Sequence, residues 1–383
     1  MPHWWNNSEQ DVLRGIYVKR GQIDYQLLIV VGILLAIGTI MVFSASAPTA
    51  YDKFNDAFYY LKKQLLMLAI GTAGMIAATF INYDFYKKFS WYIYAAGIGM
   101  LLLVFTPLGV DVNGARRWLD LGFTTVQPSE FMKFAMIILV ARHLSLPGAK
   151  LDKLKNLLFY IILLIPVIAI LQMQPHLSAT VIIALTVVVL LLTAGMKLRY
   201  FTSVVIAGAL GVATLIAMAP FRAKRFLAFL EPFNPENIRG DNWQIVNSLL
   251  AIGSGGWFGK GLGKSVQKFM YIPEPHNDFI FAIYIEEMGF IGALIVIILF
   301  AFLVYRGYSI AFHAPDKFSA FLATGITTII AIQTIMNIMV VTSLMPVTGV
   351  SLPFFSYGGT SLIFLMFSMG ILLNISKNSD KIA

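Results

Sequence analysis

The side chains best suited to chemistry lie in the segment Pro273-Glu274-Pro275-His276-Asn277-Asp278. This segment ends a long connection and opens an apolar run, and an ionisable residue at a bilayer edge is by default a candidate functional residue. Partial burial would raise the pKa of Asp278 and suit its carboxylate to accept a proton. A structural alternative stands beside this, because Asn277 or Asp278 could cap the following helix, whose dipole would lower the carboxyl pKa.

Two more acids, Glu286 and Glu287, follow within the same apolar run. On a helix, Glu286 would be rotated roughly 80° from Asp278 and Glu287 roughly 180°. Both glutamates therefore cannot face the cavity that Asp278 faces. We expect a structural role for them, with at least one paired to a donor on another helix.

A second polar group joins Arg116 and Arg117 to Glu130 and Lys133. Pro128 favours a helix start, and the spacing of three between Glu130 and Lys133 places them on one face, where they can pair. Such a pair is costly in a membrane unless it lines a wet cavity, so it indicates either a site or a buried structural pair. The two arginines could clamp a phosphate with their guanidinium groups, or anchor the chain at lipid headgroups.

Glycine-rich stretches form a third group. Arg222 and Arg225 open the long connection, and Gly253-Ser254-Gly255-Gly256 and Gly259-Lys260-Gly261 follow. Glycine lets backbone N–H groups approach an anion, although a turn is the commoner use of such a pattern.

A later stretch, 346–361, contains two prolines together with Ser356, Gly358 and Gly359. It predicts a re-entrant or broken segment, which survives in a membrane only when it is buried in protein or lines a cavity. Packing of helices through small residues is the alternative. His176, which has no matching ligands nearby in the sequence, is expected to form hydrogen bonds and not to bind a metal.

The composition indicates which elements must position these groups. The 383 residues are 58% hydrophobic and only 12% charged, whereas soluble domains carry roughly 25% charged residues. The apolar excess must therefore face lipid. The net charge of +9 comes largely from Lys and Arg in short loops, which indicates membrane topology and argues against nucleic-acid binding. The absence of cysteine excludes disulfides and thiolate metal sites.

Apolar runs that can span a bilayer, or nearly so, predict an all-α polytopic membrane protein with about ten transmembrane helices. The runs cover residues 26–48, 64–82, 91–107, 130–146, 155–172, 177–194, 199–219, 278–304, 318–343 and 354–376. An even number of crossings puts both termini on one side. Because basic residues gather in the short loops of that side, we expect both termini in the cytoplasm.

The expected organisation has three parts. Residues 1–25 form a cytoplasmic tail, either an interfacial helix or disordered, and residues 377–383 form a second cytoplasmic tail. The transmembrane domain covers 26–376 and includes a large extracytoplasmic loop, 221–277, between the seventh and eighth helices. Loops of this length are uncommon, and the tryptophans and glycines of this one indicate ordered structure over the membrane surface.

Taken together, the polar stretches resemble the SEDS family (shape, elongation, division and sporulation), the RodA, FtsW and SpoVE proteins of bacteria. The matching stretches run in family order: NGARRWLDLG (113–122), QPSEFMK (127–133), QPHLSAT (174–180), AIGSGGWFGKGLG (251–263), IPEPHNDFIFAIYIEEMGFIGA (272–293) and MPVTGVSLPFFSYGGTSL (345–362). The QPHLS and EPHND wording is nearer to the FtsW and SpoVE branch than to RodA.

This resemblance implies a peptidoglycan glycosyltransferase of the bacterial cytoplasmic membrane that polymerises lipid II with inversion. Asp278 would be its catalytic carboxylate, and undecaprenyl pyrophosphate would be the leaving group. The substrate-binding candidates are Arg116, Arg117, Glu130, Lys133, Arg222, Arg225, His276, Ser356, Gly358 and Gly359.

The resemblance also implies a divalent cation, Mg²⁺ or Mn²⁺, whose protein ligands the sequence does not identify, and a class B penicillin-binding protein as the transpeptidase partner. Two other functions fit the same residues. A lipid II flippase would need polar residues that continue to the cytoplasmic side, where the loops carry mainly topology lysines. A non-catalytic scaffold that recruits the transpeptidase would not require a carboxylate such as Asp278 at the start of the eighth helix.

Overall fold

The structure, a computed structural model, describes residues 22–379 except for 113, 123, 150, 152–153, 219–222, 224–225, 227–228, 235–241 and 270. The interfacial helix expected in the N-terminal tail lies outside these residues, as do Arg222 and Arg225. The placement of those two arginines stays a prediction.

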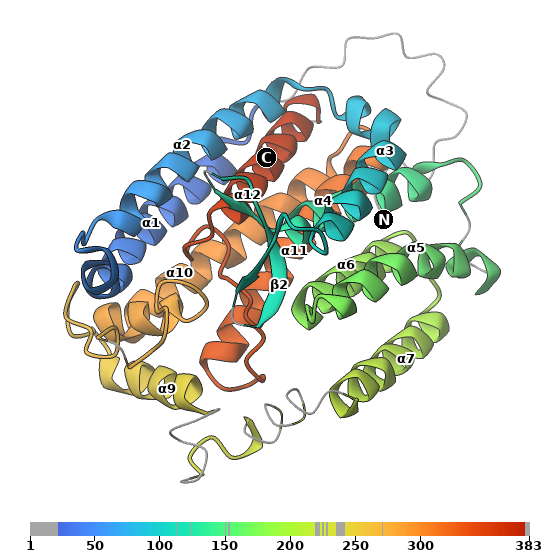
Figure 1. The fold of residues 1–383 in the computed structure, drawn as a ribbon. Coiled ribbons are helices and arrows are strands. Elements are labelled where there is room, and N and C mark those ends of the chain that lie inside the picture. The colour runs from blue at the N-terminus through green and yellow to red at the C-terminus, as the bar shows by residue number, and fades with distance from the viewer. Residues whose placement is uncertain are drawn as a thin grey trace.

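Most of the described chain is helical (Figure 1). The helices are α1 (Tyr25–Phe54), α2 (Tyr59–Phe80), α3 (Tyr83–Leu103), α4 (Pro128–Ser145), α5 (Leu154–Met173), α6 (Leu177–Thr193), α7 (Leu198–Ala217), α9 (Trp243–Gly255), α10 (Ile280–Phe312), α11 (Lys317–Val341) and α12 (Thr360–Asn378). Apart from α9, each overlaps one of the expected apolar runs. In the described chain, seven are long and apolar enough to cross a membrane. The multi-pass helical fold is therefore confirmed, and the exact number of crossings stays a prediction.

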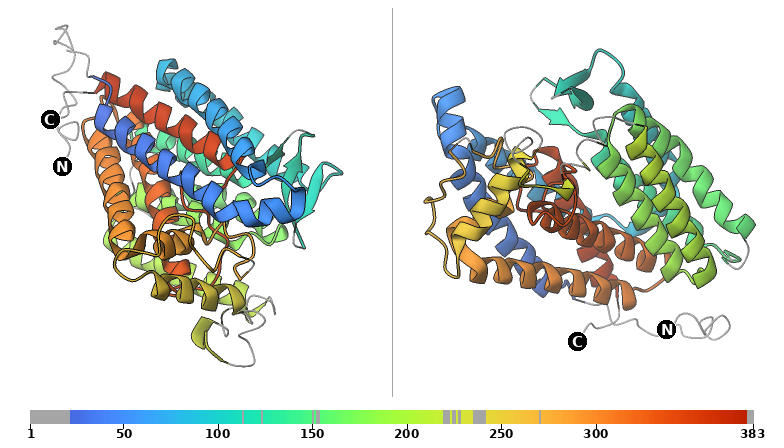
Figure 2. Two further views of the ribbon diagram at one scale, coloured as in Figure 1. Left: turned by 90° about the vertical axis from the view of Figure 1, so that its left-hand side faces the viewer. Right: turned by 90° about the horizontal axis from the view of Figure 1, so that it is seen from below.

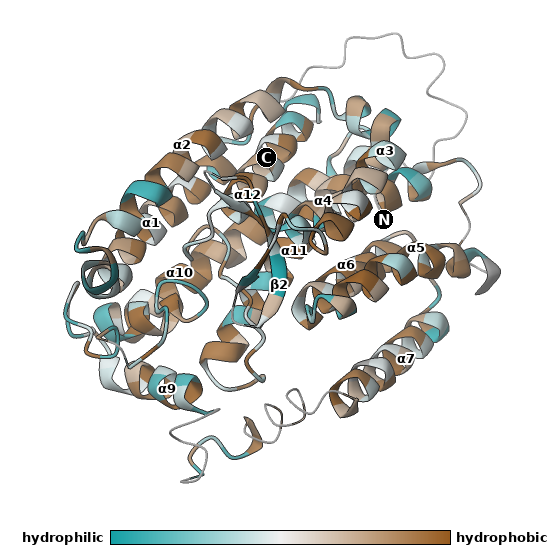
Figure 3. Cartoon of the chain, viewed as in Figure 1, coloured by the Kyte–Doolittle hydropathy of each residue, from teal (hydrophilic) through white to brown (hydrophobic). Residues whose placement is uncertain are grey.

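The core lies around α11 and α12, whose most apolar stretches are 72% and 78% buried. Helices α1 and α2 run side by side along one edge, whereas α7 lies at the opposite edge beyond α6 (Figures 1 and 2). Hydrophobic residues cover most of each helix, and hydrophilic ones gather towards helix ends and in the connections (Figure 3). This distribution is the one expected of helices that face lipid and one another.

Two polar contacts mark the opposite ends of the antiparallel helices α1 and α10. At one end Asp24 pairs with Arg306 at 2.8 Å, and at the other the Ser44 hydroxyl donates to Glu287 at 2.8 Å. Asp24 and Ser44 are separated by about 30 Å of helix, which is the thickness of a bilayer's hydrocarbon core. The Asp24 amide also donates to Ser376 near the end of α12, so the start and end of the described chain share one side.

A small sheet between α3 and α4 was not expected. Strands β1 (Gly109–Val112), β2 (Ala115–Asp120) and β3 (Thr125–Val126) form a three-stranded antiparallel sheet in the order β1-β2-β3. Its strands are too short to give a clear period-two pattern in the sequence. The sheet fixes the direction of the side chains on β2, which include Arg116 and Arg117.

Helix α10 is broken at Gly289, which has φ 71° and ψ −171°. The loop backbone supplies the hydrogen bonds that the break removes: Lys260 and Gly261 donate to the carbonyls of Glu286 and Glu287, both at 2.9 Å, and Phe290 donates to Gly256 at 2.8 Å. The approach is so close that a Cβ at Gly259 would lie 2.1 Å from the Glu287 carbonyl oxygen. The glycine-rich stretch therefore packs against the helix break, which favours the structural reading over an anion cradle.

The Asp24–Arg306 pair gives a test of the fold. Replacing Arg306 with Met leaves Asp24 buried without its cation, and breaking a buried pair costs about 3–5 kcal/mol. We expect a loss of this size in denaturation of the purified protein in detergent. The control is Lys62→Met, which removes the exposed Lys62–Asp56 pair and should cost less than about 1 kcal/mol. Equal losses in the two variants would contradict the account.

Candidate functional site

Asp278 lies just before α10, with its side chain partly exposed. The N-cap of α10 is Phe279, and no described side chain caps the helix. The Asn277 amide donates instead to the Glu274 carboxylate at 2.8 Å. The capping alternative for Asn277 and Asp278 is therefore wrong, and the Asp278 carboxylate is not committed to the helix end.

The backbone at Asp278 is held by Asn337 of α11. The Asn337 amide nitrogen donates to the carbonyls of Asp278 and Val350, each at 2.7 Å, and its side chain is fully buried. Gly349 (φ 69°) lies close to the carboxylate, because a Cβ there would be 3.3 Å from Asp278 Oδ2. Any larger residue at position 349 would be strained and would crowd this oxygen.

Residues 342–359, between α11 and α12, contain no regular helix. Much of this segment is buried, including Val350, Leu352, Phe354 and Phe355, which confirms a broken segment buried in protein. The Ser356 hydroxyl accepts a hydrogen bond from the Leu352 amide at 2.8 Å. It therefore stabilises the segment itself, and its contact with substrate stays a prediction, as do those of Gly358 and Gly359 at the start of α12.

The two arginines of β2 lie at a β-bulge, because Asp111 pairs with Arg116 and Val110 with Trp118, which makes Arg117 the extra residue of the bulge. A bulge interrupts the regular alternation of side chains along a strand. Arg116 is exposed, whereas Arg117 is partly buried. Arg117 donates from Nε to the Gln174 carbonyl at 3.2 Å and from Nη2 to the Pro175 carbonyl. Arg117 is therefore the arginine that joins the sheet to the α5–α6 junction, and a phosphate clamp formed by both arginines stays a prediction.

The start of α4 contains the expected ion pair. Lys133 Nζ lies 2.8 Å from Glu130 Oε2, and both side chains are buried. Beside it, His176 Nε2 lies 2.8 Å from Gln127 Nε2 and 3.3 Å from the Ser129 hydroxyl, so the hydrogen-bonding role expected of His176 is confirmed. Burial, together with the positive charges of Arg117 and Lys133, lowers the pKa of His176 to about 3. The ring is therefore neutral at pH 7.

The surroundings of Asp278 make its carboxyl group a better base than an ordinary one. Burial, together with the negative charge of Glu274, raises the pKa of Asp278 to about 6, although the positive charge of Arg117 opposes part of the rise. At pH 7 the group is mostly ionised, yet it accepts a proton more readily than an exposed aspartate.

His276, two residues earlier, is packed between aromatic rings. Its ring centroid lies 4.2 Å from that of Tyr60 and 5.5 Å from that of Tyr357. Burial lowers the pKa of His276 to about 4, with a contribution from Lys53. Because the side chain is only 2% exposed, its observed role is packing against these two rings, and direct contact with substrate stays a prediction.

The site thus gathers segments that are far apart in the sequence. The Ser178 hydroxyl at the start of α6 donates to the Thr348 carbonyl, next to Gly349. Sequence reasoning missed Asn337, and it included Gly349 only as part of the stretch 346–361. The one available signal was a lone amide at position 337 in an apolar run, which in a membrane indicates a function.

A metal ion would need ligands beyond the protein. Within the part of the chain that the structure describes, no group of three or more His, Cys, Asp or Glu side chains could hold one. Asp278 offers carboxylate oxygens of the kind that Mg²⁺ prefers.

Known proteins match this chain over nearly its whole length. The FtsW, RodA and SpoVE family model, described as "Cell cycle protein", matches residues 25–381. Stage V sporulation protein E of Bacillus subtilis is 42% identical, over 94% of this chain and 99% of that protein. A probable peptidoglycan glycosyltransferase FtsW of Geobacter sulfurreducens is 39% identical, over 94% and 97%.

Two solved structures are similar to this chain in fold over most of its length. A chain from a structure described as "structural coordination of polymerization and crosslinking by a peptidoglycan synthase complex" superposes with a TM-score of 0.78 at 25% identity, covering 94% of this chain and 98% of that chain. The rod shape determining protein RodA of Thermus thermophilus gives a TM-score of 0.70 at 25% identity, covering 95% and 98%.

The uncommitted carboxylate predicts that Asp278 contributes little to folding. We expect Asp278→Ala to change the free energy of unfolding by less than about 0.5 kcal/mol. The control is Asp316→Ala, because Asp316 caps α11 with a complete capping box and its loss should cost about 1 kcal/mol. Denaturation in detergent compares them, and a larger loss for Asp278→Ala would return Asp278 to a structural role.

Proposed function

The chain belongs to the FtsW, RodA and SpoVE family of cell cycle proteins, and we propose that it is a peptidoglycan glycosyltransferase that polymerises lipid II with Asp278 as its catalytic carboxylate. Three features of Asp278 together support this role. Its backbone is fixed by Asn337, its partly exposed carboxylate does not cap α10, and its pKa is raised to about 6. The FtsW and SpoVE relatives are more similar in sequence than the RodA structure, in agreement with the FtsW and SpoVE branch.

In the proposed reaction, Asp278 accepts the proton of the GlcNAc 4-hydroxyl of one lipid-linked saccharide. That oxygen forms a bond to the anomeric carbon of MurNAc on the second lipid-linked saccharide, from the face opposite the leaving group. The bond from that carbon to the pyrophosphate oxygen breaks, and undecaprenyl pyrophosphate leaves with the electron pair. A positioned base of this kind contributes typically 10²–10⁴-fold to the rate.

The leaving pyrophosphate needs positive charge fixed in advance. Arg117 is suited to this, because its two hydrogen bonds to backbone carbonyls fix the plane of the guanidinium group. Lys133 lies in the same neighbourhood and is held by Glu130. We propose Arg116, Arg222 and Arg225 as further contacts for the phosphates or for lipid headgroups.

A divalent cation, Mg²⁺ or Mn²⁺, fits this site only as an ion shared with the substrate. Asp278 would hold it in part, and substrate phosphates would complete the coordination, as is common for Mg²⁺. The ion would supply positive charge to the pyrophosphate.

The location and partner follow from the same proposal. The distribution of basic residues supports a cytoplasmic-membrane protein with both termini in the cytoplasm and Asp278 on the outer side. Similarity to a chain of a peptidoglycan synthase complex supports a class B penicillin-binding protein as the partner. A flippase and a non-catalytic scaffold are the competing functions.

The direct test is polymerisation of lipid II by the purified chain with its transpeptidase partner, in the presence of moenomycin to silence contaminating glycosyltransferases of the other class. Asp278→Asn should reduce polymerisation by at least about 10²-fold, because the base is lost. Glu274→Gln, which alters a neighbouring exposed carboxylate, should retain polymerisation.

Glycan chains of normal amount and length from Asp278→Asn would contradict the mechanism. Lipid II transport across vesicles by a wild-type protein that forms no glycan would favour the flippase.

The pH dependence gives a second test. The base works in its ionised form, so the rate should fall as the pH decreases through about 6, to about a tenth of its maximum one unit lower. Glu274→Gln should move this acid limb to lower pH, because it removes a negative charge that raises the Asp278 pKa. A limb near pH 4 in the wild-type protein, the value of an exposed carboxyl, would contradict the assignment.

A further inference from the structure

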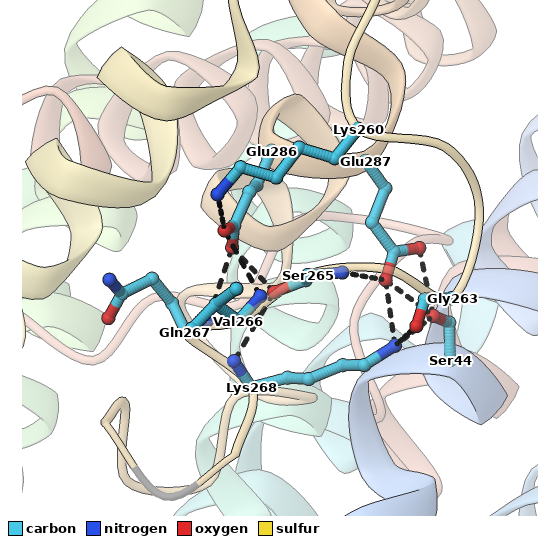
Figure 4. Close-up of polar contacts among 9 residues, drawn as sticks. All are labelled: Ser44, Lys260, Gly263, Ser265, Val266, Gln267, Lys268, Glu286 and Glu287. Carbon is cyan, nitrogen blue, oxygen red and sulfur yellow. Dashed lines mark hydrogen bonds and ion pairs between the residues drawn. The ribbon is translucent and has the colours of Figure 1, made fainter.

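The break in α10 is held by charged side chains as well as by backbone (Figure 4). Glu286 and Glu287 precede the broken residue Gly289, and both are fully buried. Their carboxylates point towards the loop segment 260–268, which supplies a lysine to each of them. We call this set, Ser44, Lys260, Ser265, Lys268, Glu286 and Glu287, the glutamate latch.

Glu286 holds the middle of the loop segment. Lys260 Nζ lies 2.6 Å from its Oε1, and the Ser265 hydroxyl donates to Oε2. The backbone amides of Val266 and Gln267 also donate to this carboxylate, at 3.1 and 3.3 Å. One side chain of α10 thus fixes a turn of the loop by side-chain and backbone contacts.

Glu287 joins the loop to a second helix. Lys268 Nζ lies 2.9 Å from Glu287 Oε1, and the Ser44 hydroxyl of α1 donates to the same carboxylate at 2.8 Å. Lys268 also donates to Ser44 at 3.1 Å and to the Gly263 carbonyl at 2.7 Å. The ammonium group is therefore surrounded by oxygen atoms, and the pair is nearly inaccessible to water.

The latch closes a short loop of chain that contains the catalytic carboxylate. Lys268 and Glu287 are 19 residues apart, and Asp278 lies midway between them in the sequence. The Asn337 contact fixes the carbonyl of Asp278 from α11, and the latch adds a charged connection between the two ends of the segment that carries Asp278. Closing a loop restricts the conformations of every residue within it, so the latch limits the movement of Asp278.

We propose that Glu286 and Glu287 are positioning residues for the glycosyl transfer, which act by holding the loop in the break of α10 and so fixing the place of Asp278. They do not touch the reacting atoms. This inference rests on the proposed function of Asp278. It differs from a purely structural role because it predicts a loss of turnover that exceeds the effect of lost stability.

The experiment measures kcat and KM for lipid II with the full chain and its transpeptidase partner. Glu287→Gln should lower kcat by about 10–100-fold and change KM by less than about threefold, because a displacement of about 1 Å at the reacting groups can cost 10²-fold. Lys260→Met removes only the Lys260–Glu286 pair, in which the Lys260 side chain is 34% exposed. It should lower kcat less than Glu287→Gln does. Because it disturbs less buried structure, it also tests the proposal if Glu287→Gln fails to fold.

The matched control is Asp24→Asn. It also removes a buried carboxylate that pairs with a cation, here Arg306 of the same helix α10, but at the opposite side of the membrane. It should destabilise the protein and leave kcat within about twofold of the wild-type value. If kcat falls as much in Asp24→Asn as in Glu287→Gln, or is unaltered in Glu287→Gln, the positioning role is overturned.

A second readout is independent of activity. The chain has no cysteine, so spin labels can be placed at Leu262→Cys in the loop and Leu121→Cys beside the sheet, both exposed positions. The distribution of distances between the labels should be narrow in the otherwise wild-type protein and broad with Glu287→Gln. A distribution that stays narrow overturns the latch.

The two proposals fail in different ways. If the wild-type protein does not polymerise lipid II, the proposed function fails whatever the labels show. If the wild-type protein polymerises lipid II and Asp278→Asn does not, an unaltered kcat in Glu287→Gln overturns the positioning role alone.

Discussion

The structure depends on one constraint: a membrane interior contains no water, so backbone groups that leave a helix must find partners within the protein. The break at Gly289 is paired by the loop backbone from 256 to 261. The non-helical segment 342–359 is tied to the start of α10 by Asn337, and the α5–α6 junction is tied to the sheet by Arg117. The segments that leave regular helix therefore support one another, and the candidate site lies among them.

The same constraint separates the structural acids from the catalytic candidate. Each buried carboxylate elsewhere in this framework has a cation at 2.6–2.9 Å: Asp24 has Arg306, Glu130 has Lys133, Glu286 has Lys260 and Glu287 has Lys268. Such pairs offset the cost of burying a charge. Asp278 is different, because burial and Glu274 raise its pKa while Arg117 opposes them only in part. Its charge remains available for proton transfer, whereas the four buried acids among the described residues are each paired with a cation.

Local patterns predicted much of this arrangement. Apolar runs located the long helices, the three-residue spacing predicted the Glu130–Lys133 pair, and the prolines and glycines of 346–361 predicted the broken segment. The donor that we expected on another helix is Ser44 of α1, which donates to Glu287. The lysine partners of Glu286 and Glu287 could not be predicted, because they lie in a loop whose path the sequence does not reveal. The break at Gly289 was missed, because a single glycine is tolerated in a helix. Helix capping by Asn277 or Asp278 was an alternative that local sequence allowed and that the structure excludes.

The central claim is that lipid II polymerisation needs a carboxylate at position 278. The most direct test removes this carboxylate and restores it by chemical modification. In a chain that lacks other cysteines, Asp278→Cys can be alkylated with iodoacetate, which adds a carboxylate, or with iodoacetamide, which adds a neutral amide of nearly the same size. Lipid II polymerisation should return measurably with the carboxylate and stay absent with the amide. Equal polymerisation by the two alkylated proteins would contradict a role for the charge at this position.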